Sequence, residues 1–227
     1  DKNLMLGEMA EFANAGYVVA SIYYRSSAQG HYPDQLLDVK TAVRFLRANA
    51  QKYEIDPERV GVFGRSAGGH LSAMMAMNQD GFDGEEWAGY SSEIQASCDM
   101  FGPVDVRALM EGEEARFSDP NFRWHRLEDT HGGALIGGDP ATMKERAELA
   151  SPVNMVNPKM CPLQILHGDN DPIVPIEKSS EVLYQKIVSA GMEDRVEFYT
   201  FPGAGHGSRE FFQDSVKKLQ IEFFDRY

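Results

Sequence analysis

A serine lies at the centre of the clearest chemical motif in this sequence. Gly64-Arg65-Ser66-Ala67-Gly68 matches the pattern G-x-S-x-G, in which a strand turns tightly into a helix and presents the serine. An apolar run ends at Phe63, and small or apolar residues continue from Ala67, so the flanking segments suit that turn. We expect both glycines to be needed so that strand and helix can approach closely. The pattern predicts a nucleophilic Ser66; the alternative is a serine in an ordinary tight turn.

A serine hydroxyl becomes an effective nucleophile only when a neighbouring base takes its proton. In proteins with this motif the chain order is serine, then acid, then histidine. His206 fits this order because it lies in the glycine-rich segment 203–207, directly after the last apolar run. The remaining histidines fit the order or the position less well: His31, His70, His125, His131 and His167. The base is therefore expected to be His206, with a surface-loop histidine as the alternative.

The acid that orients this base is expected on the segment after the preceding apolar run, which reads His-Gly-Asp-Asn-Asp-Pro over 167–172. It offers Asp169 and Asp171, and spacing alone does not separate them. The same letters could suggest a calcium loop, but Val174 and Ser180 occupy the positions where that loop needs glycine and glutamate. We expect no metal and no cofactor here.

These residues must be positioned by alternating strands and helices. Strands are predicted at 17–24, 60–63, 94–101, 163–166 and 196–201 from runs of β-branched and aromatic residues. Helices are predicted at 5–12, 36–50, 67–77, 141–149, 176–190 and 210–224 from apolar residues at helical spacing. The alternation indicates an α/β fold: one domain over 1–227 with a mostly parallel sheet covered by helices on both faces.

The segment 104–133 interrupts this rhythm with a long, charged stretch. Loops of such length are usually functional, so we predict a cap or rim over the site. Phe117, Phe122 and Trp124 would then offer an apolar wall to a substrate. The alternative is a solvated excursion. His131-Gly132-Gly133 is interpreted as part of a loop.

Composition narrows the possible partners. Lys and Arg number 22 against 35 Asp and Glu, which gives a net charge of −13. Such a surface repels nucleic acid and anionic lipid, so neither is expected as a partner. Cys98 and Cys161 are predicted to be free thiols, and this tilts the compartment toward a reducing one, cytoplasmic rather than secreted.

Three segments together resemble the α/β-hydrolase superfamily. They are 64–71, His-Gly-Asp-Asn-Asp-Pro-Ile-Val-Pro over 167–175, and Gly-His-Gly over 205–207. Within that superfamily the sequence is most similar to the esterase branch of acetyl-xylan and feruloyl esterases and lipase-like carboxylesterases. The resemblance implies that Asp171 is the acid, with Asp169 as a turn residue. It also implies that the Ala67 N–H is one donor of the oxyanion hole.

The resemblance further implies a function. Its members would cleave carboxylic esters with short acyl, acetyl or feruloyl groups, on small molecules or on carbohydrate, through a Ser-His-Asp triad and an acyl-enzyme. A prolyl-oligopeptidase-like serine peptidase or an arylformamidase shares the motifs. A non-catalytic binding module on the same fold is the alternative from another class.

Three features depart from that branch. A His-Gly-Gly motif is absent before Ser66, and the first three of the branch's eight strands have no counterpart here. We therefore expect the domain to be N-terminally incomplete, with a preceding segment that completes the sheet and carries the second oxyanion donor. The other departure is Arg65 beside the nucleophile, which is expected either to contact substrate or to pair with an acidic neighbour.

Overall fold

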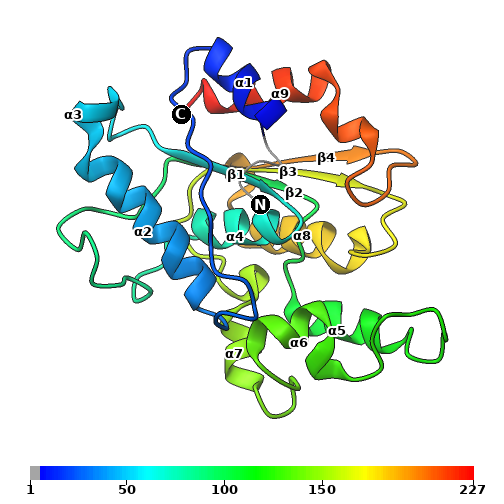
Figure 1. Cartoon of the computed structure of the whole chain (residues 1–227). Coiled ribbons are helices and arrows are strands. Elements are labelled where there is room, and N and C mark those ends of the chain that lie inside the picture. The colour runs from blue at the N-terminus through cyan, green and yellow to red at the C-terminus, as the bar shows by residue number, and fades with distance from the viewer. Residues whose placement is uncertain (1–5) are drawn as a thin grey trace.

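The computed structural model describes residues 6–227, and its centre is a four-stranded parallel sheet (Figure 1). The strands are β1 (Gly61–Arg65), β2 (Ala96–Met100), β3 (Leu163–Gly168) and β4 (Val196–Phe201). They lie side by side in chain order, and each pairs in parallel with the next. Because all four run in one direction, the loops that follow them gather at one edge of the sheet. This confirms the predicted α/β architecture.

Helices cover both faces of the sheet, as expected for a parallel sheet (Figure 1). One face carries α1 (Leu6–Asn14) and α9 (Asp214–Phe224), and the other carries α2 (Asp34–Ala48), α4 (Ala67–Ala76) and α8 (Ser180–Ser189). Two buried apolar clusters result, one containing Phe12 and Phe223 and the other Leu36 and Leu183. Met5, which the sequence places in the first helix, lies outside the described residues.

Shorter elements make up the rest of the described chain. The helices are α3 (Ala50–Tyr53), α5 (Val106–Glu114), α6 (His131–Ile136) and α7 (Lys144–Leu149). Single turns of 3-10 helix are η2 (Leu127–Asp129), η3 (Pro152–Asn154), η4 (Ile176–Lys178), η5 (Glu193–Arg195) and η6 (Arg209–Phe212). Within residues 6–227 no helix is long and apolar enough to cross a membrane. Cys98 and Cys161 are both buried free thiols.

The strand predicted at 17–24 is wrong for the structure as described. The segment is extended between α1 and α2 but joins no ladder (Figure 1). A strand forms only when its N–H and C=O groups find a partner, and no described residues supply one between this segment and the outer edge of β1. Segment 17–24 has the residue types of a β-strand, but it has no neighbouring strand to pair with among the described residues.

The interpretation of 104–133 as irregular is also wrong in part, because α5, η2 and the start of α6 occupy it. Asp105 caps α5: its Oδ1 accepts hydrogen bonds from the N–H groups of Arg107 and Ala108 at 2.9 and 3.1 Å. An aspartate followed by Val-Arg-Ala-Leu-Met is the N-cap signal that could have predicted this helix.

His131-Gly132-Gly133 opens α6 and is not a loop. Thr130 caps the helix by accepting a hydrogen bond from the N–H of Gly133 at 3.1 Å. A Cβ on Gly133 would lie 1.9 Å from the carbonyl oxygen of Leu127. The glycine is therefore required because α6 packs tightly against the turn before it.

Candidate active site

Ser66 occupies a strained turn between β1 and α4. Its backbone angles are φ 53° and ψ −117°, and its N–H donates to the carbonyl of Met100 on the neighbouring strand at 2.9 Å. Such a left-handed conformation costs a non-glycine residue roughly 1–3 kcal/mol and occurs where the fold imposes it. The turn projects the serine from the carboxyl end of the sheet.

The two motif glycines differ in what they contribute. A Cβ on Gly64 would lie 2.4 Å from the carbonyl oxygen of Gly68, so this position admits no side chain. A Cβ on Gly68 would meet nothing within 4 Å. The expectation that both must lack a side chain for close packing is therefore wrong for Gly68. The tight second position is Gly69, where a Cβ would lie 2.4 Å from Asp99 Oδ1.

His206 lies between Ser66 and Asp171. Its Nε2 is 2.8 Å from Ser66 Oγ, and its Nδ1 is 2.7 Å from Asp171 Oδ2. A carboxylate accepts hydrogen bonds and does not donate them, so Nδ1 carries the proton in the neutral ring. Nε2 then carries no proton and can accept a hydrogen bond from the serine hydroxyl. The structure thus brings together the three side chains that the sequence proposes as nucleophile, base and acid.

Asp171 is buried, with 6% of its surface exposed, and is well supplied with donors. Its Oδ1 accepts from the N–H groups of Ile173 and Val174 at 2.9 Å each. Burial alone would raise the pKa of the Asp171 carboxyl. The hydrogen bonds from His167, His206 and the Val174 N–H outweigh burial and hold that pKa well below its usual range.

The structure gives the neighbouring aspartate a different task. Asp169 Oδ1 accepts a hydrogen bond from the N–H of Gly203 at 2.6 Å, which ties the loop after β3 to the loop after β4. Asp169 is therefore placed as a turn residue, while Asp171 contacts the imidazole of His206.

Phe101 is a neighbour of this site that the sequence analysis did not identify. It follows β2 with φ 47°, and its ring meets the imidazole of His206 edge-on with centroids 4.9 Å apart. It also packs against Phe211 at 4.7 Å. A bulky residue with positive φ is rare and marks an imposed position, but no sequence signal reveals φ.

Ala67 is the first residue of α4, exposed and directly after Ser66. The first N–H groups of an α-helix have no partner within the helix and carry partial positive charge. The Ala67 N–H therefore suits an oxyanion near Ser66, although its part in an oxyanion hole remains a prediction.

Arg65 is held on the face of the sheet that α1 and α9 cover. Its Nη1 lies 3.2 Å from Glu8 Oε1, and its guanidinium stacks over the ring of Phe212 at 4.9 Å. These contacts match the expected pairing with an acidic neighbour, and they place Arg65 as a link between α1 and the segment after His206. Contact between Arg65 and a substrate remains a prediction.

The three aromatic residues predicted as a substrate wall form a cluster of their own. Centroids of Phe117 and Phe122 are 6.3 Å apart, and those of Phe122 and Trp124 are 5.5 Å apart. Trp124 continues to the ring of His131 at 4.4 Å, and the Arg116 guanidinium lies over Phe122 at 4.2 Å. They form one patch beside α5 and α6, and a contact with substrate remains a prediction.

Four of the five histidines that the sequence analysis set aside have partners outside this site. The Nε2 of buried His70 lies 2.7 Å from the Ala150 carbonyl. The Nδ1 atoms of three others are also within hydrogen-bonding distance of oxygen: His31 to Ala134 O at 2.9 Å, His125 to Phe117 O at 3.2 Å, and His131 to Glu113 Oε1 at 2.7 Å. None of these four interactions involves Ser66 or Asp171.

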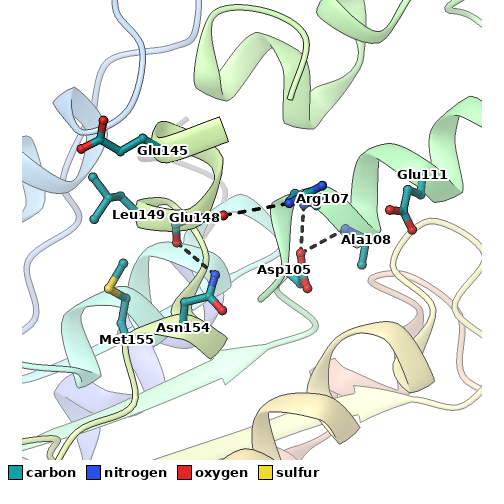
Figure 2. A pocket seen from close by; sticks show the side chains of 9 residues that line it. All are labelled: Asp105, Arg107, Ala108, Glu111, Glu145, Glu148, Leu149, Asn154 and Met155. Atoms are coloured by element: carbon teal, nitrogen blue, oxygen red, sulfur yellow. Dashed lines mark hydrogen bonds and ion pairs between the residues drawn. The ribbon is translucent and has the colours of Figure 1, made fainter. Parts of the chain in front are cut away.

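A pocket of about 660 Å³ opens between α5, α7 and η3 (Figure 2). Its lining is polar, with Arg107 and Glu148 4.0 Å apart across it and Glu111 and Glu145 on its two helices. The residues that line this pocket do not include Ser66, His206 or Asp171. The pocket is therefore distinct from the site formed by Ser66, His206 and Asp171.

The fold and this constellation define the class of the protein: it has the α/β-hydrolase fold of esterases. The sequence matches the BD-FAE family over residues 1–187, and the chain belongs to that family. It is 31% identical over 201 residues to "Esterase LipC" of Mycobacterium tuberculosis. The aligned region covers 88% of this chain and 47% of LipC. The chain thus spans about half the length of this curated relative.

Two solved structures extend the likeness. A "Truncated form of carbohydrate esterase from gut microbiota" is 33% identical, with a TM-score of 0.83 over 97% of this chain and 77% of that one. An "acetyl ester-xyloside bifunctional hydrolase" from Caldicellulosiruptor lactoaceticus is 25% identical, with a TM-score of 0.67 over 89% of this chain and 69% of that one. Both agree with the fold predicted from the sequence.

Proposed function

We propose that this protein is a serine hydrolase of carboxylic esters. The observation that carries the proposal is the continuous contact from Ser66 Oγ through His206 to Asp171, at 2.8 and 2.7 Å. Within hydrogen-bonding distance a neutral imidazole can take the serine proton as the nucleophile attacks. The esterases among its relatives support the same reaction.

The chemistry follows from these three residues. Ser66 Oγ bonds to the ester carbonyl carbon while its proton passes to His206 Nε2, and the carbonyl oxygen becomes an oxyanion near the Ala67 N–H. The carbon–oxygen bond to the alcohol then breaks, and the alcohol leaves with the proton from His206. A water molecule next attacks the acyl-enzyme, His206 takes the water proton, and the carboxylic acid leaves as Ser66 regains its hydrogen. Asp171 keeps the imidazole oriented and stabilises its cation.

We propose short acyl, acetyl or feruloyl esters as substrates, including esters on carbohydrate. The support is the similarity to a carbohydrate esterase and to an acetyl ester-xyloside hydrolase. A panel of acetylated xylan, methyl ferulate and p-nitrophenyl esters of rising chain length tests it. Acetate release from acetylated xylan is the expected result, and turnover confined to long-chain esters would contradict it.

The reaction itself is tested by hydrolysis of p-nitrophenyl acetate. Ser66→Ala should abolish turnover because it removes the hydroxyl that contacts His206 Nε2. Ser72→Ala is a matched control on the same helix: Ser72 is buried and its Oγ makes no hydrogen bond within the described residues. Full activity of Ser66→Ala would overturn the proposal, whereas no hydrolysis by the unaltered protein would favour the non-catalytic binding module.

We also propose that the outer edge of β1 accepts a further strand, as the sequence analysis expects. The supporting observation is that β1 is an end strand among the described residues while segment 17–24 stays extended without a partner. The added segment would bring the second oxyanion donor. Intact-mass measurement of the active protein tests this: a single 25.3 kDa species that folds and hydrolyses esters would contradict it.

A further inference from the structure

His167 is a buried histidine that the proposed reaction does not use. It lies at the end of β3, none of its surface is exposed, and Asp171 follows four residues later. Its Nε2 is 2.9 Å from the carbonyl oxygen of Val174 and 3.3 Å from Asp171 Oδ2. Its Nδ1 is 2.6 Å from the hydroxyl of Ser180, the first residue of α8. Both ring nitrogens therefore have polar partners in the protein interior.

The carbonyl of Val174 fixes where a proton must be on this ring. A carbonyl oxygen only accepts hydrogen bonds, so Nε2 of His167 carries a hydrogen and donates it. The same N–H faces the carboxylate of Asp171, which also only accepts. In the neutral ring Nδ1 accepts the hydrogen bond from the Ser180 hydroxyl, and this contact sets the rotation of the imidazole.

The result is a carboxylate held on both oxygens. Oδ1 of Asp171 accepts two backbone N–H groups, from Ile173 and Val174. Oδ2 faces the Nδ1 of His206 at 2.7 Å and the Nε2 of His167 at 3.3 Å. Rotation of the carboxylate would break hydrogen bonds at both ends, so Oδ2 stays aligned with the imidazole that faces Ser66.

We propose that His167 is a positioning residue for Asp171, whose Nε2–H holds Oδ2 of that carboxylate in line with His206. The inference rests on the proposed function, since it assigns His167 a role through the acid of the triad. A side chain that only filled space at this position would need no donor at Nε2. Buried groups that support a catalytic side chain in this way fix its geometry within a fraction of an ångström.

His70 provides the comparison for a buried histidine with a merely structural role. It is also nearly fully buried, and its Nε2 contacts a backbone carbonyl, that of Ala150, at 2.7 Å. This hydrogen bond joins the ring to a backbone carbonyl and not to a carboxylate. Removing either imidazole should cost stability, but only removal of His167 should disturb the acid that orients His206.

The first experiment compares His167→Phe and His167→Gln with the unaltered protein on p-nitrophenyl acetate. Phenylalanine keeps the ring volume without a donor, so kcat should fall roughly 10- to 100-fold with KM nearly unchanged. The Gln amide reaches the position of Nε2 and can donate, so it should restore most of that loss. Equal activity of the Phe variant and the unaltered protein would overturn the proposal.

The second experiment is a double-mutant cycle with Asp171→Asn. If His167 acts through Asp171, His167→Phe should lower kcat little further once the carboxylate is gone. His70→Phe is the matched control, and its effect should multiply with that of Asp171→Asn. If His167→Phe lowered kcat by the same factor with and without Asp171→Asn, His167 would have a role independent of Asp171, and the proposal would be contradicted.

A spectroscopic measurement covers the case in which His167→Phe folds poorly. Ser180→Ala removes the partner of Nδ1 and keeps the imidazole, so the NMR resonance of the His206 Nδ1–H should shift without loss of fold. An unchanged resonance in a folded Ser180→Ala protein would overturn the inference. Ser66→Ala separates the two hypotheses: its full activity would remove the proposed function, whereas its inactivity beside an unaffected His167→Phe would remove only this one.

Discussion

The Nε2 atom of His206 lies 2.8 Å from the Oγ atom of Ser66, although 140 positions separate the two residues. Ser66 follows β1, and His206 lies in the loop after β4, at the opposite end of the sheet order. Contact across that width arises because parallel strands end at one edge, where the loop after β4 turns back toward the serine. Phe101, which follows β2, packs against the imidazole of His206.

The two aspartates after β3 should differ sharply in their effect on turnover. Asp171→Asn replaces a carboxylate with a side chain that can present its amide N–H₂ to His206 and so favour the wrong tautomer. In a serine protease the same kind of change costs about 10⁴ in kcat, so a loss of about 10² to 10⁴ is expected here. Asp169→Asn keeps a side-chain oxygen that can still accept the hydrogen bond from the Gly203 N–H, so its effect on turnover should be small. Steady-state kinetics on p-nitrophenyl acetate compare them, and a larger loss for Asp169→Asn would show that the acid is misassigned.

The motif glycines should respond in opposite directions to alanine. Gly64→Ala would place a Cβ 2.4 Å from the backbone oxygen of Gly68, so the elbow must move and the free energy of unfolding should fall by about 2 kcal/mol or more. Gly68→Ala meets open space within α4 and should gain up to about 1 kcal/mol of helix propensity. Urea denaturation measures both. Equal destabilisation of the two variants would contradict the packing described for this turn.

Asp99 should make the stability of the fold depend on pH. It lies in β2 with no exposed surface, and burial raises its pKa to about 6 although the Gly102 N–H donates to its Oδ1 at 2.8 Å. Between about pH 4 and 6 the folded state keeps a proton that the unfolded state, with a pKa of about 3.9, releases. The contribution of Asp99 to stability should therefore fall as the pH rises through this window and then stay low.

Asp99→Asn removes that titration. Its stability relative to the unaltered protein should rise by roughly 2 kcal/mol between pH 4 and pH 7, somewhat less than the equivalent of two full pKa units because the unfolded carboxyl is already about half ionised at pH 4. Urea denaturation at intervals across this range measures the difference. Curves that run parallel for the two proteins would mean that Asp99 titrates normally in the folded state.

The aromatic patch of Phe117, Phe122 and Trp124 should matter for substrates with a large acyl group if it forms the predicted wall. Trp124→Ala should then raise KM for methyl ferulate several-fold and change KM for p-nitrophenyl acetate little, because the acetyl group needs no extended surface. Trp87→Ala is a control, since Trp87 is exposed and packs on Phe45 of α2. Identical effects of both variants on the two esters would remove the wall from the site.

The sequence by itself determined the class of fold and indicated Ser66 and His206 of the candidate site, while it left Asp169 and Asp171 as alternatives for the acid. Alternating apolar runs and helical periods specify a parallel sheet, because each element must bury one apolar face. The strand–turn–helix context of Ser66 and the loop position of His206 follow from glycine and chain order, which are local properties. The sequence also carries a local signal for α5, because Asp105 caps the first turn of that helix.

The tertiary structure decided what depends on partners distant in the chain. Segment 17–24 has the residues of a strand yet forms none, since pairing needs a neighbour that the described chain does not place there. Asp169 and Asp171 have the same chemistry two positions apart, and only the direction of the loop after β3 turns one toward Gly203 and the other toward His206. The ring of Phe101 and the donor of His167 reach the site for the same reason. A side chain's partner is set by where the backbone of other elements lies, and that is a property of the packed molecule.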